Sequence, residues 1–255
     1  MTTDIITSRD NPWIKQCRAL AQDSAAYRKA GQVWLEGDHL CRALLTRGLL
    51  PSAVVLTESR PFVADDWGLP STVRRVVVAD RLMAWISGLD SPPQVACLYG
   101  LPKQTTLNAD APTVVLDRLQ DPGNVGSILR SAAAFGFQQV AAVKGSASLW
   151  SPKVLRAGMG AHFGLHLVEG LDVAHVQALS VPLVATSSHQ GVLLHEAPLP
   201  WPCAWLMGHE GQGVSEALME RAAHHVRIAQ PGGEESLNVA AAAAICLHAS
   251  AVGRL

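Results

Sequence analysis

Short apolar runs alternate with helical candidates throughout the second half of the chain, and this alternation is the strongest constraint on its fold. The runs are TVVLD, QQVAAV, LHLVE, PLVATS, CAWLMG and HHVRIA, and the helical candidates between and after them lie at 124–135, 151–158, 172–179, 215–223 and 236–252. Strands joined through helices predict an α/β fold with a mainly parallel sheet covered on both faces. In such sheets, ligands bind beyond the carboxyl ends of the strands.

The first half of the chain has the pattern of a smaller α/β module. NPWIKQCRALAQDSAAYRKAG predicts one amphipathic helix ended by Gly31, and DHLCRALLTRG and RLMAWISGL predict two more. The runs VWLEG, AVVLT and VRRVVVAD predict strands. A polar segment, LYGLPKQTTLNADAPTVV, then interrupts the pattern, and we interpret it as a linker. The expected domains are therefore 1–105 and 106–255.

Composition limits the classes of function. A chain of 255 residues with 49% hydrophobic content can bury a substantial core. No apolar run approaches the ~20 residues needed to span a bilayer, and the polar start lacks the order of a secretory signal, so a cytoplasmic location is expected. The net charge of −1 argues mildly against a non-specific nucleic-acid binder, although basic residues gather toward the start of the first half.

Neither a metal site nor a disulfide framework is expected. The cysteines are scattered without a C-x-x-C pair, at Cys17, Cys41, Cys97, Cys203 and Cys246. The histidines that could suggest metal binding or acid–base chemistry have irregular spacing, and we interpret them as structural or surface residues: His162, His209, His224 and His225.

The stretch DPGNVGSILRSAAAFG follows the first strand of the second half. Pro122 and Gly123 predict a turn, and Asn124 is a candidate cap for a helix whose exposed amides favour an anion. Arg130 lies off the apolar stripe of that helix, among small side chains. A solvated face is normally richer in charge, so this face is expected to abut a partner or ligand with one guanidinium directed at it. An ordinary surface arginine is the alternative.

Two further stretches follow later strands. CAWLMGHEGQGVSEALME contains three glycines that let the backbone approach a ligand closely, although it matches neither a dinucleotide nor a Walker motif and purely structural glycines fit equally well. VRIAQPGGEESLNVAAAAAICLHA contains a Pro-Gly-Gly turn, and Ser236 is a plausible cap for the helix that follows.

Taken together, the three stretches are much more specific. The order Asn-x-Gly-x-x-x-Arg, then Gly-x-Glu-Gly-x-Gly, then Ile…Gly…Ser-Leu-Asn-Val resembles the three motifs of the SpoU/TrmH branch of the SPOUT RNA methyltransferases, and the likeness covers 113–252. SPKVLRAGMGAHFGLHL also resembles a segment between the first two motifs. The first half resembles the ribosomal-protein-like RNA-binding domain that many members carry.

The resemblance implies a deep trefoil knot, a homodimer, and transfer of a methyl group from S-adenosylmethionine to a ribose 2′-hydroxyl in RNA, without a metal. It places cofactor contacts at Gly208, Gly211, Ile228 and Leu237, and catalytic or substrate-orienting groups at Asn124, Arg130, Glu210, Ser236 and Asn238. Ribosomal RNA is favoured as the substrate because of the front domain, and transfer RNA is the alternative.

The chain departs from the family pattern at a few positions. Ala229 and Gln230 stand where many relatives have Pro-Met, Ala240 stands where they often have Ser, and the region of Ala157 lacks a frequent serine. These departures affect packing, cofactor affinity or the dimer surface more than the reacting groups. A non-catalytic RNA-binding protein with the same fold is the alternative, and the presence of Arg130, Glu210 and Asn238 weighs against it. A different nucleotide-dependent α/β enzyme is disfavoured because the Rossmann fingerprint is missing.

Overall fold

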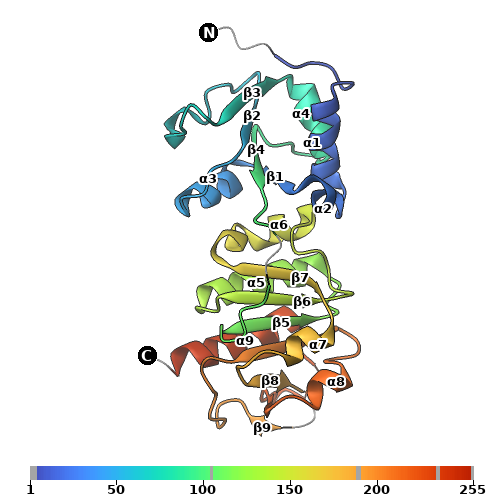
Figure 1. The fold of residues 1–255 in the computed structure, drawn as a ribbon, viewed down its shortest axis with the longest axis vertical. Helices are drawn as coiled ribbons and strands as arrows, with labels where there is room; N and C mark the ends of the chain where they lie inside the picture. The colour runs from blue at the N-terminus through green and yellow to red at the C-terminus, as the bar shows by residue number, and fades with distance from the viewer. Residues whose placement is uncertain (1–4, 104–105, 188–190, 234–235, 254–255) are drawn as a thin grey trace. The chain divides into compact units, whose positions relative to one another are not determined.

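The computed structural model describes residues 5–103, 106–187, 191–233 and 236–253 (Figure 1). The chain forms two compact units, and each contains its own sheet. One unit comprises Met1–Lys103 with Trp150–Phe163, and the other comprises Gln104–Leu149 with Gly164–Leu255. The first unit therefore includes a segment that lies, in sequence, within the expected 106–255 domain.

A four-stranded mixed sheet forms the centre of the first unit. Its order is β1 (Gln32–Glu36), β4 (Val95–Gly100), β2 (Ala53–Thr57) and β3 (Arg74–Val78), with only β2 and β3 parallel. The helices are α1 (Pro12–Gln22), α2 (Ala26–Ala30), α3 (Asp38–Thr46), α4 (Asp80–Ser87) and α6 (Pro152–Gly158), with 3₁₀ turns at Asp65–Trp67 and Ala161–Gly164. Helices α1 and α4 lie side by side (Figure 1).

The single helix predicted up to Gly31 is in fact two helices. Asp23 adopts an extended backbone after α1, and its carboxylate accepts the N–H of Ala25 at 2.8 Å. Such a bond offers the backbone an alternative to continuing the helix. The predicted stop at Gly31 is confirmed, since Gly31 ends α2 in the left-handed region with φ +64°.

A seven-stranded parallel sheet forms the second unit, as the alternation predicted. Its order is β7 (His166–Leu171), β6 (Gln139–Val143), β5 (Thr113–Asp117), β10 (Ala204–Gly208), β8 (Leu183–Thr186), β11 (His224–Arg227) and β9 (Val192–Leu193). Six of these strands match the predicted runs. Strand β9 was not predicted, because a strand of two residues has no periodicity to detect.

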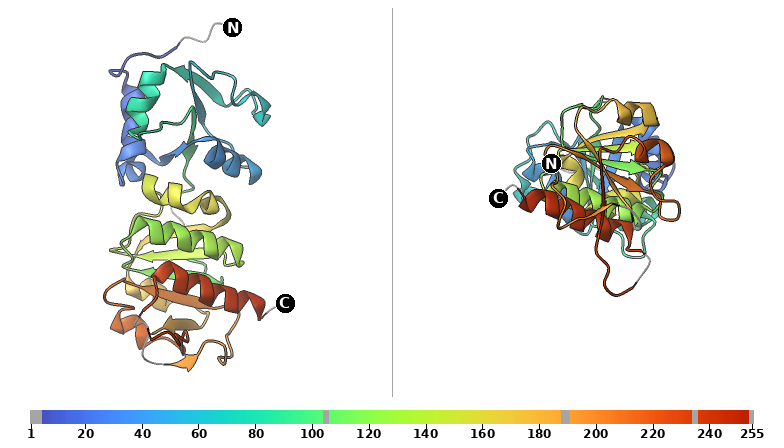
Figure 2. Two further views of the ribbon diagram at one scale, coloured as in Figure 1. Left: turned by 180° about the vertical axis from the view of Figure 1, so that it is seen from behind. Right: turned by 90° about the horizontal axis from the view of Figure 1, so that it is seen from below.

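Helices cover both faces of this sheet (Figures 1 and 2). On one face α5 (Pro122–Ala134) lies beside α9 (Val239–Val252), where Ser250 accepts a hydrogen bond from the buried Trp205 indole at 2.9 Å. On the other face, the short helices α7 (Val173–Gln177) and α8 (Glu216–Met219) pack on the core formed by the sheet's alternate side chains. The sheet is therefore buried on both sides.

The two helices nearest the predicted site begin at residues other than those expected. Asp121 caps α5 by accepting the Asn124 N–H at 2.7 Å, and Pro122 occupies the first turn, where no N–H is required. Asn238, not Ser236, caps α9. The side chain of Asn124 is thereby left available for other contacts.

Candidate functional site

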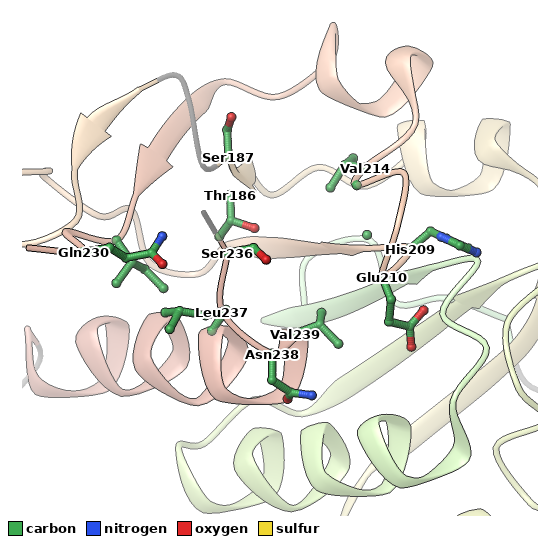
Figure 3. A pocket seen from close by; sticks show the side chains of 14 residues that line it. Thr186, Ser187, His209, Glu210, Val214, Gln230, Ser236, Leu237, Asn238 and Val239 are labelled. Atoms are coloured by element: carbon green, nitrogen blue, oxygen red, sulfur yellow. The ribbon is translucent and has the colours of Figure 1, made fainter. Parts of the chain in front are cut away.

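A cavity of about 360 Å³ lies at the carboxyl edge of the parallel sheet, a size usual for small-molecule sites (Figure 3). It is lined from the ends of β8 and β10, the segment after β11, and the start of α9. The lining residues are Thr186, Ser187, Gly208, His209, Glu210, Gly213, Val214, Ile228, Gln230, Ser236, Leu237, Asn238, Val239 and Ala242. The second and third sequence stretches, which follow two different strands, therefore meet in one hollow, as expected for a ligand site beyond the carboxyl ends of parallel strands.

The loop after β10 is a small closed turn. His209 and Gly213 exchange backbone hydrogen bonds at 3.0 and 2.8 Å, and Gly213 has φ +69°. A Cβ on Gly208 would lie 2.2 Å from the Gly213 carbonyl carbon. Gly208 must therefore be glycine for the loop to fold back at all, and it lines the cavity as well. Gly211, at the outside of the turn, donates to His209 and does not line the cavity.

Three polar side chains from the three stretches form a chain of hydrogen bonds. Asn238 donates from Nδ2 to Asn124 Oδ1 at 3.0 Å, and Asn124 donates from Nδ2 to Glu210 Oε1 at 3.3 Å. Asn238 also caps α9 through its Oδ1, which accepts the amides of Ala240 and Ala241. We call Asn124, Glu210 and Asn238 the polar cluster. It joins α5, the β10 loop and α9 at the cavity, although these segments are far apart in sequence.

The environment of Glu210 favours its ionised form. Partial burial raises the pKa of this carboxyl, but hydrogen bonds from its own amide, from the Asn124 side chain and from the amides of Asp121 and Gln120 outweigh burial and lower the pKa below its ordinary value. The polar cluster therefore contains a carboxylate at neutral pH.

Arg130 lies outside this cavity. It is exposed on α5, and within the described residues its guanidinium has no hydrogen-bond or ion-pair partner in the chain. The structure thus brings Asn124, Glu210, Ser236 and Asn238 together but leaves Arg130 unengaged.

Two residues at the end of β5 also stabilise the loop beside the cavity, although they were not predicted from the sequence. Asp117 is fully buried, and its carboxylate accepts the Ser215 amide at 2.6 Å and the Arg118 Nε at 3.2 Å. Arg118, in the left-handed region with φ +59°, reaches across to Gln212 Oε1 at 2.9 Å. The C-terminal side of the β10 loop is therefore tied to the end of β5. The sequence feature that could have identified Asp117 is its position as an acidic residue at the end of the otherwise apolar run TVVLD.

The described part of the chain contains neither a cluster of metal-binding side chains nor a helix that could span a membrane. No three His, Cys, Asp or Glu side chains there are grouped to hold a metal ion. The same residues include no helix long and apolar enough to cross a membrane. All five cysteines are free and buried.

The cavity has the features that a nucleoside-like cofactor requires. A close backbone approach at Gly208 lets main-chain groups face a ligand, and Ile228 and Leu237 supply apolar walls. The buried Oε1 of Gln230 has no hydrogen-bond partner among the described residues, so a ligand atom can satisfy it.

Comparisons with known proteins agree with this geometry. Residues 111–248 match the model of the SpoU rRNA Methylase family. A Synechocystis protein named as an uncharacterized tRNA/rRNA methyltransferase is 33% identical over 97% of this chain and 94% of its own length. The 23S rRNA (guanosine(2553)-2′-O)-methyltransferase RlmP of Bacillus subtilis is 30% identical over 86% of this chain and 88% of its own.

Solved structures show the same likeness. An AdoMet-bound rRNA methyltransferase from Sinorhizobium meliloti superposes with a TM-score of 0.85 at 26% identity, covering 99% of both chains. The family model alone spans more than half of the chain, and the second and third motifs that suggested the family line the cavity. The chain belongs to the SpoU rRNA methylase family.

Proposed function

We propose that this chain is an S-adenosylmethionine-dependent methyltransferase that methylates a ribose 2′-hydroxyl in structured RNA. The observation that supports this most is the meeting of the polar cluster with the glycine-edged cavity at the carboxyl edge of the sheet. Ribosomal RNA is the favoured substrate, because two relatives that span most of the chain are named as 23S rRNA 2′-O-methyltransferases, and transfer RNA is the alternative. Either substrate is consistent with a cytoplasmic protein.

The cavity residues Gly208, Ile228 and Leu237 would hold the cofactor, with Gly211 shaping the loop beside it. When bound, the cofactor supplies an electrophilic methyl group on a sulfonium. The protein then has to align a ribose hydroxyl with that group and exclude other orientations.

The polar cluster and Ser236 are the groups placed to orient the ribose. Amide and hydroxyl side chains can donate to and accept from a 2′-hydroxyl, and the Glu210 carboxylate fixes the orientation of the Asn124 amide. Arg130 would bind an RNA phosphate and stabilise negative charge developing on the 2′-oxygen. Its guanidinium carries only hydrogen-bond donors and no acceptor, so it cannot take up the proton.

A homodimer would bring Arg130 to a cavity. The helix α9 has no charged side chain, and its exposed residues Ala241, Ile245, His248 and Val252 follow one stripe. Such an uncharged exposed stripe is typical of an interface. Because Arg130 lies on the adjacent α5 and outside its own cavity, we propose that it serves the cavity of the second copy.

We further propose that 106–255 form a trefoil-knotted methyltransferase domain and 1–105 a ribosomal-protein-like RNA-binding domain. What supports the knot is the strand order, in which β10 lies between β5 and β8 although it follows both in the chain. What supports RNA binding is the gathering of basic residues near the start of the first half.

Substitution of Arg130 tests these roles. Arg130→Ala should abolish methyl transfer to RNA while the Kd for S-adenosylmethionine, measured by calorimetry, changes by less than about twofold, because the guanidinium lies outside the cavity. Arg221→Ala, at another exposed arginine of the same unit, is the matched control and should retain activity.

Mixed dimers test whether the site is shared. Combining Arg130→Ala chains with Glu210→Ala chains should restore part of the activity, because one cavity of each mixed dimer keeps both groups. Equal loss of binding and transfer in Arg130→Ala would show that Arg130 has a different role. Wild-type protein that binds RNA and cofactor without transfer would identify the non-catalytic alternative.

A further inference from the structure

We propose that the Gln230 side chain recognises the adenine ring of S-adenosylmethionine. This inference rests on the proposed function, because it assigns one group of the cofactor to one end of the same cavity. Gln230 is one of the positions at which the chain departs from the family pattern, and the sequence reading gave it no role.

The position of Gln230 supports a ligand contact. It follows β11 by three residues and lines the cavity beside the apolar side chains of Ile228 and Leu237. Figure 3 shows its amide directed toward Thr186 and Ser236, into the cavity. Its Oε1 is buried and accepts no hydrogen bond from the described residues. A buried amide oxygen without a donor is unfavourable, so this atom is poised for a donor that arrives with the ligand.

The chemistry of the side chain selects adenine among the parts of the cofactor. A carboxamide presents one acceptor beside two donors, and adenine presents an exocyclic amino donor beside a ring-nitrogen acceptor. Glutamine and asparagine form this paired contact with adenine in nucleic acids. The apolar side chains of Ile228 and Leu237 suit an aromatic ring better than the charged amino-acid end of the cofactor.

The arrangement of the cavity agrees with this assignment. Figure 3 shows Gln230 and Leu237 at the end away from His209 and Glu210. The polar cluster, which orients the ribose of the RNA, includes Glu210 and therefore belongs to the opposite end. Adenine at Gln230 leaves the reactive part of the cofactor free to extend toward that cluster.

Calorimetry with two ligands tests the contact without using activity. The ligands are S-adenosylhomocysteine and its 6-deamino analogue, in which a hydrogen replaces the exocyclic amino group. Wild-type full-length protein should bind S-adenosylhomocysteine about tenfold more tightly than the analogue, the value of roughly one buried hydrogen bond.

The variants separate the effect of the amide group from the effect of the side chain's length. Gln230→Met keeps the length of the side chain without the amide, and its preference for the amino ligand should fall to about two- to threefold. Gln230→Glu keeps an oxygen acceptor and should retain most of the preference. Gln138→Met makes the same substitution at an exposed residue outside the cavity and should keep the wild-type ratio.

The outcomes distinguish this inference from the proposed function. If wild-type protein binds S-adenosylhomocysteine and Gln230→Met shows the same ligand preference as wild type, the inference alone is overturned. If wild-type protein binds neither ligand, the cavity is not the cofactor site and both proposals are overturned. Circular dichroism of each variant establishes that it is folded.

Discussion

At the scale of single residues, the polar cluster combines structural and chemical roles. Asn238 caps α9 with its Oδ1 while its Nδ2 fixes Asn124, and Asn124 in turn donates to Glu210. Loss of a helix cap costs about 0.5–2 kcal/mol, so replacement of Asn238 by alanine would weaken the start of α9 as well as the cluster. Asn238→Asp keeps the capping oxygen but replaces the donor with a charged carboxylate oxygen that repels Asn124 Oδ1, so it disrupts the cluster while the cap is retained.

The ionisation of Glu210 gives a prediction about pH. Because the pKa of its carboxyl is lowered in the folded protein, its stabilising contacts are fully present above the ordinary value of 4.5 and are lost as the pH falls through the lowered folded value. Carbon-detected NMR of labelled glutamate should therefore show Glu210 titrating below pH 4.5. Asn124→Ala removes one donor and should move the midpoint upward. A wild-type midpoint above 4.5 would contradict the arrangement of donors described here.

Sequence alone identified part of this site. Asn124, Glu210, Ser236 and Asn238 were named from motifs, and they do come together. Asp117 was missed because its partner Ser215 lies far away in sequence and reaches it only through the fold. The cavity contacts of Thr186, Ser187 and Gln230 were missed for a similar reason: a short polar residue after a strand looks like an ordinary loop until the sheet order is known.

At the scale of elements, α9 carries the clearest prediction. Its exposed stripe centres on Ile245, which is 42% exposed. Ile245→Asp would bury a charge in the proposed dimer interface and should convert the protein to a monomer in sedimentation experiments. Val192→Asp places the same charge on β9, where the side chain is also exposed, and should leave the dimer intact. A wild-type monomer, or an Ile245→Asp variant that remains dimeric, would refute this interface.

Strands could be predicted more accurately than helix ends, because the two depend on different features of the sequence. Buried parallel strands are continuous apolar runs, so β5 and β10 could be found within a residue of their ends. Helix ends depend on competition between local hydrogen bonds. Asp23 ends α1 before the predicted stop, and the cap at Asp121 lets α5 begin two residues before the predicted start. Several polar residues near each boundary could have capped the helix, so the sequence does not single out one of them.

At the scale of the whole molecule, the chain folds as two units whose boundaries are not continuous in sequence. The linker near residue 104 is marked by its composition, but no pattern in SPKVLRAGMGAHF indicates that Trp150–Phe163 group with the first unit. The strand order of the large sheet is equally hidden, because each strand carries the same apolar signal. The resemblance to a family, rather than periodicity, supplied what was expected of topology and chemistry.

The proposed function requires the cavity and the polar cluster together to direct a methyl group to a ribose oxygen of RNA. The most direct test incubates the protein with methyl-labelled S-adenosylmethionine and ribosomal RNA from cells that lack it, and then digests the RNA with alkali. A 2′-O-methyl group removes the hydroxyl that attacks the neighbouring phosphate, so the label should remain in an alkali-resistant dinucleotide. Label released in single nucleotides, or no label with either ribosomal or transfer RNA, would contradict the account.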